Sequence, residues 1–278
     1  MIFQSDNTNL NIKNAVGYLT FPALENYSFV KHAFSTRFGG VSEGQFKSMN
    51  LSFYNDDKKE NVVENYHLFC EALGLKFETL VAAAQNHGDN IRIVGKNEKG
   101  IGIYRDRDMQ SVDGLLTNCE EVTLVTYHAD CAPIFFLDRC KKVIGLVHSG
   151  WRGTAKEIAG KMVSKMQREF ACQLKDITCV VGPCVDECCY EVGEEVYEKF
   201  VSIPDVAVKS FMKKCDANLK YILNIKEANK QILLKAGISE ENIVISDVCT
   251  CCYIDLFFSQ RAMGNNRGTL AAFFCLKN

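Results

Sequence analysis

Three apolar runs lie close together in residues 122–159, VTLVTYHADCAPIFFLDRCKKVIGLVHSGWRGTAKEIA. A polar loop separates the first two runs, a tight turn separates the next two, and a glycine-rich loop follows the third. This order predicts three strands and then a helix that begins near Thr154 and extends to Phe170. Cys131 and His148 each stand where an apolar run meets a loop, a position in which a rigid scaffold holds a side chain beside a cleft.

Apolar spacing predicts further helices and strands along the rest of the chain. Residues 60–73 predict a helix that Gly74 ends, and further helices are predicted at 193–202 and after Asn224. Strands are predicted at 80–84, 90–94, 177–181 and 269–276. Residues 95–112 are rich in charge and predict an exposed loop or hairpin. The irregular order of strands and helices predicts an α+β fold, with mixed β-sheets layered with α-helices in a single domain, 1–278.

Composition restricts the classes of partner. The chain has 278 residues, 47% of them hydrophobic and 24% charged, with a formal net charge of −2. It shows no basic stripe of the kind that binds nucleic acid, and no apolar run near the ~18 residues that span a membrane. Because the first residues also lack the pattern of a signal peptide, we expect a cytoplasmic protein.

Fourteen cysteines are unusual for such a chain. Without an export signal we interpret most of them as reduced thiols that pack as small hydrophobic side chains. Two clusters differ, in GPCVDECCYEVG (182–193) and in CTCCY (249–253). We interpret Cys184, Cys188, Cys249 and Cys252 as buried thiols, with a second metal site or a redox pair as the alternative if they approach one another.

Cys131 and His148 are also suitable zinc ligands. A catalytic zinc site uses three protein ligands and keeps the fourth position open, and His nitrogen and Cys sulfur are preferred donors. The third ligand must come from the other histidines, His32, His67, His87 and His128. We favour His87, in a loop after a predicted strand, although His128 competes because it lies only three residues from Cys131. Asp130 is a candidate proton carrier or a partner of the ligands.

Three other interpretations use the same residues. Cys131 could be a nucleophile with His148 as base and Asp130 or Asn50 as orienting group. A Cys and two His could also bind one copper ion. Finally, Cys131 could be a buried thiol and His148 an ordinary hydrogen-bonded histidine.

Two glycine-rich stretches are candidate anion sites. Arg37 precedes Gly39 and Gly40, where a guanidinium could reach an anion beside exposed amides, although a surface hairpin with a solvated arginine explains the same pattern. The segment HSGWRGT (148–154) places glycines and free N–H groups at a predicted helix start, which favours an anion such as phosphate.

Eight motifs together resemble the YfiH-type laccase-domain family, also called multicopper polyphenol oxidase-like and purine nucleoside phosphorylase. They are FSTRFGGVS (34–42), MNLS (49–52), QNHGDNI (85–91), DGLLTN (113–118), ADCAPIFFLD (129–138), VIGLVHSGWRGT (143–154), GPCVDECCYEVG (182–193) and CTCCYIDLFFSQR (249–261). The resemblance covers nearly the whole chain. It implies that His87, Cys131 and His148 bind one zinc ion, and it disfavours His128, which stands where the family has a small or hydroxyl residue.

The resemblance implies phosphorolysis of adenosine, inosine, guanosine and S-methyl-5′-thioadenosine, together with deamination of adenosine. Zinc held by His and Cys lowers the pKa of a bound water to near 7, and the resulting hydroxide can attack C6 of the purine. Arg37, Arg152 and Asn50 are then the candidate phosphate or substrate contacts. Copper-dependent polyphenol oxidation and a peptidoglycan-editing hydrolysis that uses Cys131 and His148 are the alternatives.

Overall fold

The computed structural model describes residues 5–215 and 219–277. Its helices are α1 (Pro22–Glu25), α2 (Lys59–Leu73), α3 (Trp151–Ala155), α4 (Ile158–Phe170), α5 (Glu194–Val201), α6 (Ile225–Lys235) and α7 (Gln260–Met263). Its first strands are β1 (Asn9–Lys13), β2 (Val16–Thr20), β3 (Val30–Ser35), β4 (Leu80–Ala82), β5 (Ile91–Ile93), β6 (Gly114–Thr117), β7 (Thr123–His128) and β8 (Ala132–Asp138). The later strands are β9 (Val143–Ser149), β10 (Ile177–Val181), β11 (Glu191–Gly193), β12 (Met212–Lys214), β13 (Lys220–Leu223), β14 (Ile243–Ile245) and β15 (Leu270–Leu276).

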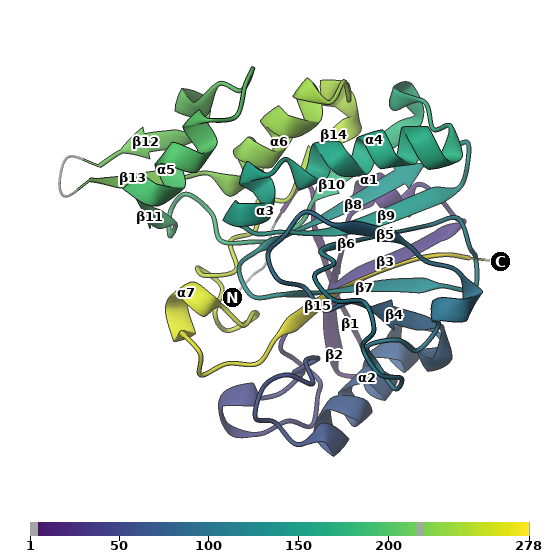
Figure 1. Cartoon of the computed structure of the whole chain (residues 1–278). Helices are drawn as coiled ribbons and strands as arrows, with labels where there is room; N and C mark the ends of the chain where they lie inside the picture. Colours follow the sequence, from purple (N-terminus) through teal and green to yellow (C-terminus); the bar gives the residue numbers. More distant parts are fainter. Residues whose placement is uncertain (1–4, 216–218, 278) are drawn as a thin grey trace.

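Two six-stranded sheets pack face to face, and helices cover their outer faces (Figure 1). The strand order is β1-β2-β3-β15-β7-β4 in the first sheet and β14-β10-β8-β9-β6-β5 in the second. Helices α4 and α6 lie on the second sheet, and α2 lies on the first (Figure 1). Most neighbouring strands are antiparallel, but β4–β7, β5–β6 and β10–β14 are parallel. The predicted α+β fold with mixed sheets is therefore confirmed.

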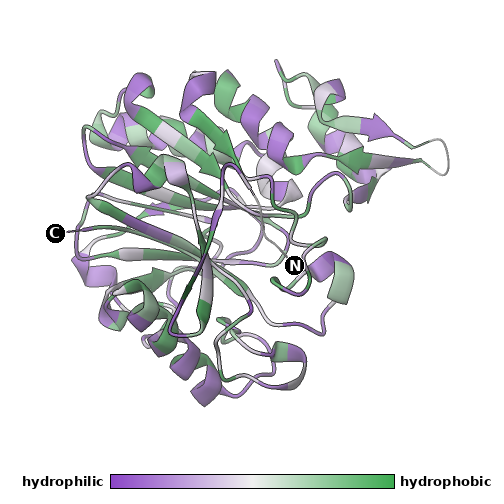
Figure 2. Ribbon diagram, turned by 180° about the vertical axis from the view of Figure 1, so that it is seen from behind, coloured by the Kyte–Doolittle hydropathy of each residue, from purple (hydrophilic) through white to green (hydrophobic). Residues whose placement is uncertain are grey.

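Side chains that alternate along the central strands pack into two hydrophobic cores, one on each face of the sheet. In β8, Ile134 and Phe136 pack toward α4 and α6, whereas Phe135 and Leu137 pack between the two sheets. Every residue of β8 is buried, which a strand with both faces covered requires. Figure 2 shows the matching pattern, with hydrophobic strands inside and helices that turn polar residues outward.

A third, smaller sheet of order β11-β13-β12 lies beside α5, at one end of the molecule (Figure 1). Tyr197 of α5 stacks on Tyr221 of β13, with 4.2 Å between ring centroids. This unit follows the segment that carries the first cysteine cluster.

Two predicted elements were wrong in detail. The helix expected from Thr154 to Phe170 is two helices, because Glu157 adopts a left-handed conformation with φ of 59° and ends the first of them. Residues 95–112 are not simply an exposed loop, since Ile101, Ile103 and Met109 are buried. Those three apolar side chains anchor the segment to the protein. No helix in the described ranges is both long and apolar enough to cross a membrane.

Candidate metal centre

The structure brings His87, Cys131 and His148 together. Their candidate ligand atoms all lie within 4.8 Å of one another. The rings of His87 and His148 are 4.9 Å apart between centroids and nearly perpendicular, at 74°. Two nitrogens and one sulfur on three separate segments match the donors of an open zinc site.

Strand register accounts for the meeting of Cys131 and His148. In the antiparallel pair of β8 and β9, Pro133 lies opposite His148. Cys131, just before β8, therefore lies beside the end of β9. Gly114, the first residue of β6, pairs with Val147 on the other side of β9, which places Asp113 at the same edge of the sheet.

Asp113 connects the loop of His87 to the ring of His148. Its fully buried carboxylate accepts hydrogen bonds from the backbone N–H groups of Asn86, His87 and Gly88, at 3.2, 3.0 and 2.8 Å. The same carboxylate is 2.9 Å from Nδ1 of His148. A carboxylate that holds one ring nitrogen of a histidine orients the other nitrogen toward a metal. Asp113 thus fixes the loop of one candidate ligand and the ring orientation of another.

Gly150 makes the approach of the ligands possible. A Cβ atom at this position would lie 2.8 Å from Sγ of Cys131 and 3.1 Å from Cδ2 of His87. Any side chain here would displace two candidate ligands. The glycine that suggested an anion site in the sequence is required here by the close packing of the candidate ligands.

The other histidines have other partners. Nε2 of His128 is 2.7 Å from Oγ1 of Thr126, and its Nδ1 is 3.0 Å from the carbonyl oxygen of Cys131. Burial and the neighbouring His148 lower the pKa of His128 well below its usual value, so its ring is neutral. His32 accepts a hydrogen bond from the backbone of Phe21, and His67 packs on Phe77 at the surface. The preference for His87 over these rings agrees with this geometry.

Cys131 and His148 shift the pKa of each other. Burial would raise the pKa of the Cys131 thiol, but the adjacent His148 and His87 rings lower it to about 6. Burial likewise opposes protonation of His148, yet the Cys131 thiolate and the Asp113 carboxylate raise the pKa of His148 to about 9. Without metal, the pair is therefore a thiolate beside an imidazolium near neutral pH. Asp113 also fills the orienting role that the nucleophile interpretation gave to Asp130 or Asn50, so that part of the prediction was wrong.

The three candidate ligands line a cavity of about 210 Å³. Two arginines, Arg107 and Arg267, line it as well, together with Tyr54. The Arg107 guanidinium carbon lies 3.3 Å from the centroid of the Tyr54 ring, and burial lowers the pKa of this arginine. Its Nε is a buried nitrogen without a hydrogen-bond partner among the described residues. A cationic side chain that lines a cavity favours an anionic or polar ligand.

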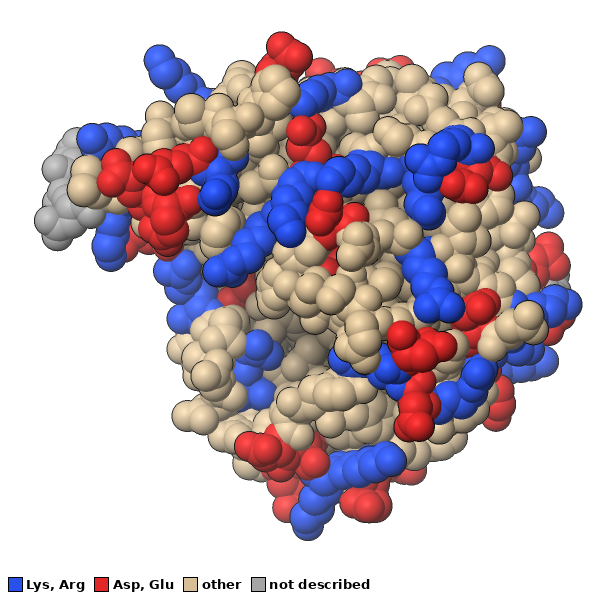
Figure 3. Space-filling view, in the orientation of Figure 1, with Lys and Arg blue, Asp and Glu red and all other residues tan. Residues whose placement is uncertain are grey.

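The cavity is part of a larger hollow. An adjoining cavity of about 380 Å³ shares Ser52, Tyr54, Arg267 and Thr269 with it. Figure 3 shows a hollow beside α7 with basic side chains near its edge, while acidic and basic groups are interspersed over the rest of this face. A further cavity of about 310 Å³ lies on the other side of Cys131, which lines both.

Asp130 lies next to Cys131, but its carboxylate is fully engaged with another segment. It accepts hydrogen bonds from Oγ1 of Thr250 at 2.6 Å, Oγ of Ser259 at 2.9 Å and the backbone N–H of Arg261 at 2.6 Å. Its backbone has a φ of 80°. These contacts make Asp130 a positioning residue that holds the segment before α7 against the metal centre.

Arg37, Asn50 and Arg152 are not among the described residues that line the 210 Å³ cavity. The guanidinium of Arg37 donates to the carbonyl oxygens of Lys47 and Ile254. Asn50 is buried and bonds with Ser52, which does line the cavity. Arg152 is exposed, with its guanidinium carbon 4.2 Å from the ring of Trp151.

Asp113, Arg107 and Arg267 were missed as site residues. Asp113 was not singled out, although its position just before a strand is the same kind of signal that singled out Cys131. Arg107 lies in the segment that charge alone predicted to be exposed, and its buried apolar neighbours Ile103 and Met109 were the available signal. Arg267 lies in a polar loop with no local pattern that marks it.

The donor set fits one zinc ion. Asp113 occupies Nδ1 of His148, which leaves Nε2 for a metal, and Cys131 ionises readily beside two histidines. The cavity beside the three donors provides room for a fourth ligand. Three protein ligands and an accessible fourth position are the arrangement of catalytic rather than structural zinc.

Comparison with known proteins shows similarity over nearly the whole chain. A family model described as multi-copper polyphenol oxidoreductase laccase matches residues 31–277. The chain is 31% identical over 257 residues to the purine nucleoside phosphorylase YlmD of Bacillus subtilis (strain 168), with 91% of each chain covered. It is 30% identical over 256 residues to the adenosine deaminase RL5 of an unknown prokaryotic organism, with 88% of this chain and 95% of that one covered. The crystal structure of the Bacillus licheniformis hypothetical protein YfiH has a TM-score of 0.90 at 32% identity, and covers 95% of this chain and 97% of that one.

Proposed function

The chain belongs to the multi-copper polyphenol oxidoreductase laccase family, and we propose that it is a zinc-dependent purine nucleoside phosphorylase. Its proposed substrates are adenosine, inosine, guanosine and S-methyl-5′-thioadenosine, cleaved with phosphate, and it also deaminates adenosine. Similar proteins are named for each of these activities. The observation that carries the proposal is the placement of a three-donor metal site and two arginines in one cavity.

Zinc is favoured over a multicopper centre by the number and use of the histidines. The sequence has five histidines, and His32 and His128 bond to other protein groups. Among the described residues, His87 and His148 are the two histidines that lie with a cysteine in a group that could hold a metal ion. One cysteine and two histidines suit a single ion with an open position, whereas a multicopper cluster needs many more histidines.

Phosphorolysis requires an anion site beside the reacting sugar. A phosphate oxygen forms the bond to C1′ as the N-glycosidic bond breaks, and the purine keeps that electron pair and takes up a proton. Arg107 and Arg267 are the proposed phosphate contacts, since both residues line the cavity and arginine binds phosphate oxygens well. Arg152 remains a proposed phosphate contact, although it is not among the described residues that line this cavity. Arg37 and Asn50 act through the backbone they hold, which presents Ser52 and Tyr54 to the cavity.

Deamination places a different demand on the same cavity. Water adds its oxygen to C6 of adenosine and ammonia leaves, giving inosine without any use of phosphate. A zinc ion held by His87, Cys131 and His148 supplies Lewis acidity and lowers the pKa of bound water. His148 is kept in one ring orientation by Asp113, and Asp130 keeps the segment around Ser259 closed against the site.

The test is a product analysis on zinc-loaded protein given adenosine with and without phosphate. We expect adenine and ribose 1-phosphate only when phosphate is present, and inosine in both cases. Arg107→Met should raise the KM for phosphate by about tenfold or more, because a charged contact is removed, while deamination persists. The matched control is Arg92→Met, a surface arginine 4.0 Å from Asp108, which should leave both activities unchanged.

Other outcomes would support the other functions. If adenosine, inosine and guanosine all remain intact, the nucleoside proposal is wrong. Oxidation of phenols by copper-loaded protein, with no nucleoside turnover, would instead support a polyphenol oxidase. Cleavage of muropeptide precursors that depends on Cys131 and His148 would support a cell-wall role.

A further inference from the structure

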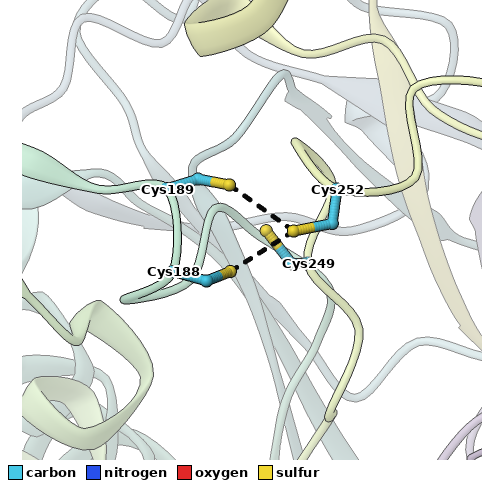
Figure 4. A group of neighbouring side chains, drawn as sticks. All are labelled: Cys188, Cys189, Cys249 and Cys252. Atoms are coloured by element: carbon cyan, nitrogen blue, oxygen red, sulfur yellow. Dashed lines mark hydrogen bonds between the residues drawn. The ribbon is translucent and has the colours of Figure 1, made fainter.

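A second group of potential ligands lies outside the candidate metal centre. The sulfur atoms of Cys188, Cys189, Cys249 and Cys252 all lie within 4.8 Å of one another. Figure 4 shows these side chains pointing toward one another from two segments. The interpretation as buried thiols is wrong for Cys188 and Cys252, which are exposed, and Cys189 takes the place that the sequence suggested for Cys184.

Backbone pairing brings the two cysteine-bearing segments together. Cys184 and Cys249 form an isolated parallel bridge, and the N–H of Thr250 donates to the carbonyl oxygen of Cys184 at 3.0 Å. The N–H of Cys189 donates to the carbonyl oxygen of Asp186 at 2.9 Å, which turns the chain so that Cys188 and Cys189 face the other segment. Two pairs of cysteine sulfur atoms, from segments about 60 residues apart in sequence, therefore meet through ordinary main-chain contacts.

The sulfur positions fit a tetrahedral ion. Zinc binds thiolate sulfur at about 2.3 Å, so two sulfur atoms at corners of the tetrahedron lie about 3.8 Å apart. The Sγ atoms of Cys188 and Cys252 are 3.3 Å apart, and those of Cys189 and Cys252 are 3.5 Å apart. Small outward movements of exposed side chains would bring these pairs to the required separation.

A hydrogen-bond donor and a buried cation lie close to Cys249. The backbone N–H of Asp186 donates to Sγ of Cys249 at 3.4 Å, a contact that stabilises negative charge on sulfur. Lys226 is 3% exposed, and its ammonium group lies 2.6 Å from Oδ2 of Asp186 and 3.0 Å from the carbonyl oxygen of Val248. One buried cation thus ties the segment of Cys188 to the segment of Cys249.

We propose that Cys188, Cys189, Cys249 and Cys252 bind a second zinc ion, which is structural. All four ligand positions are filled by protein sulfur, so water or substrate has no position on the ion. Binding replaces the protons of the thiols, which pass to solvent, and involves no oxidation or reduction.

The site has a defined structural role. Thr250 lies between Cys249 and Cys252 and donates its hydroxyl hydrogen to Asp130, the residue beside Cys131. Val185, in the other segment, lines the cavity that Asp130 and Cys131 also line, and its N–H donates to the carbonyl oxygen of Asp130. A zinc ion that joins the two segments would therefore hold one wall of this cavity in place.

The first experiment counts zinc in the full chain purified under reducing conditions with zinc supplied. We expect two zinc ions per chain, one in Cys131→Ala, one in Cys252→Ala and none in the double variant. Cys251→Ala is the matched control, because Cys251 lies in the same segment but outside the four-sulfur group, and it should keep two. One zinc in the natural chain with none in Cys131→Ala would overturn the proposal, even if the candidate centre functions as proposed.

A second measurement separates the metal from a disulfide. The four sulfur atoms could also yield a disulfide, which would require an added oxidant and would leave twelve of the fourteen thiols to titrate in denaturant. Loss of two thiols together with an unchanged zinc count in Cys252→Ala would overturn the proposal. We expect fourteen thiols after zinc removal, and Co²⁺ bound to Cys131→Ala should give the visible bands of tetrahedral thiolate ligation. Those bands should disappear in the Cys131→Ala, Cys252→Ala double variant and persist in the Cys131→Ala, Cys251→Ala double variant.

Discussion

The two sulfur-containing groups are supported in different ways. His87, Cys131 and His148 lie at the edge of a sheet, and the buried carboxylate of Asp113 holds two of their three segments. The four cysteines lie on loops, which main-chain pairing and the Lys226–Asp186 ion pair hold together. All three members of the first group line one cavity and Cys131 also lines another, whereas the four sulfur atoms of the second group face one another. A rigidly supported metal site with an open position is suited to catalysis. A metal site whose positions are all filled by protein is suited to joining loops.

Substitution of Asp113 should have the largest effect, because it should weaken zinc binding at the candidate centre and leave the four-cysteine group unchanged. Asp113→Asn keeps the size of the side chain but removes the charge that orients His148, and the amide cannot accept at both positions. We expect the affinity of the candidate centre for zinc to fall about 10- to 100-fold, with activity falling in parallel. Zinc titration with a competing chelator measures this, and the zinc bound by the four cysteines should be unaffected. Asp108→Asn, a surface carboxylate, is the control, and equal effects of the two substitutions would contradict the role of Asp113.

A smaller effect is expected when only the space between the ligands is reduced. Gly150→Ala would place a methyl group 2.8 Å from Sγ of Cys131, so the ligands must move by several tenths of an ångström. We expect weaker zinc binding and a loss of about 1–3 kcal/mol in the free energy of unfolding, from overpacking. Chemical denaturation of the metal-free protein measures the second quantity.

Gly160→Ala in α4 is the matched substitution for Gly150→Ala. Its added methyl group would be 3.6 Å from the nearest atom, an ordinary contact with Ile232. Because alanine favours a helix over glycine by about 0.5–1 kcal/mol, this variant should be as stable as the natural chain or more so. A destabilised Gly160→Ala beside an unaffected Gly150→Ala would contradict the close packing described for the centre.

The mildest test compares the thiols of the two groups by pH. In metal-free protein the histidines lower the pKa of Cys131 to about 6, while partial desolvation and the neighbouring Cys252 raise the pKa of the exposed Cys188 to about 12. Because the thiolate is the reactive form, alkylation of Cys131 should increase through pH 6 and level off by about pH 7.5. Alkylation of Cys188 should still be increasing at pH 9. Mass spectrometry of labelled peptides measures both rates, and a common profile would contradict this difference.

The sequence predicted the strand-end part of the centre well because local patterns control it. The apolar runs around Cys131 and His148 set the strands, and antiparallel pairing then places both residues at one edge. His87 was harder to select, because its loop is held by backbone contacts to Asp113 rather than by a pattern of its own. Asn224 was correctly predicted to begin a helix, where its side chain accepts from the N–H of Glu227 at 2.9 Å.

Residues brought in by long connections could not be placed from the sequence. Arg107 reaches the cavity because Ile101, Ile103 and Met109 pack against the protein, which reverses the expectation from the charges around them. Arg267 reaches it through contacts with Gln260 and the backbone of Gly268. Arg37 illustrates the opposite error, since its glycine-rich setting suggested an anion site but its guanidinium bonds to carbonyl oxygens.

The position of β15 has a consequence for how the protein is made. This strand follows β3 and β7 in the sequence, yet it lies between them in the first sheet and pairs with both. During synthesis, the facing edges of β3 and β7 therefore remain without a partner until residues 270–276 have left the ribosome. Open edges beside apolar surface favour aggregation, and such distant pairing slows folding. Until β15 is complete, the nascent chain therefore depends on being kept from contact with other chains.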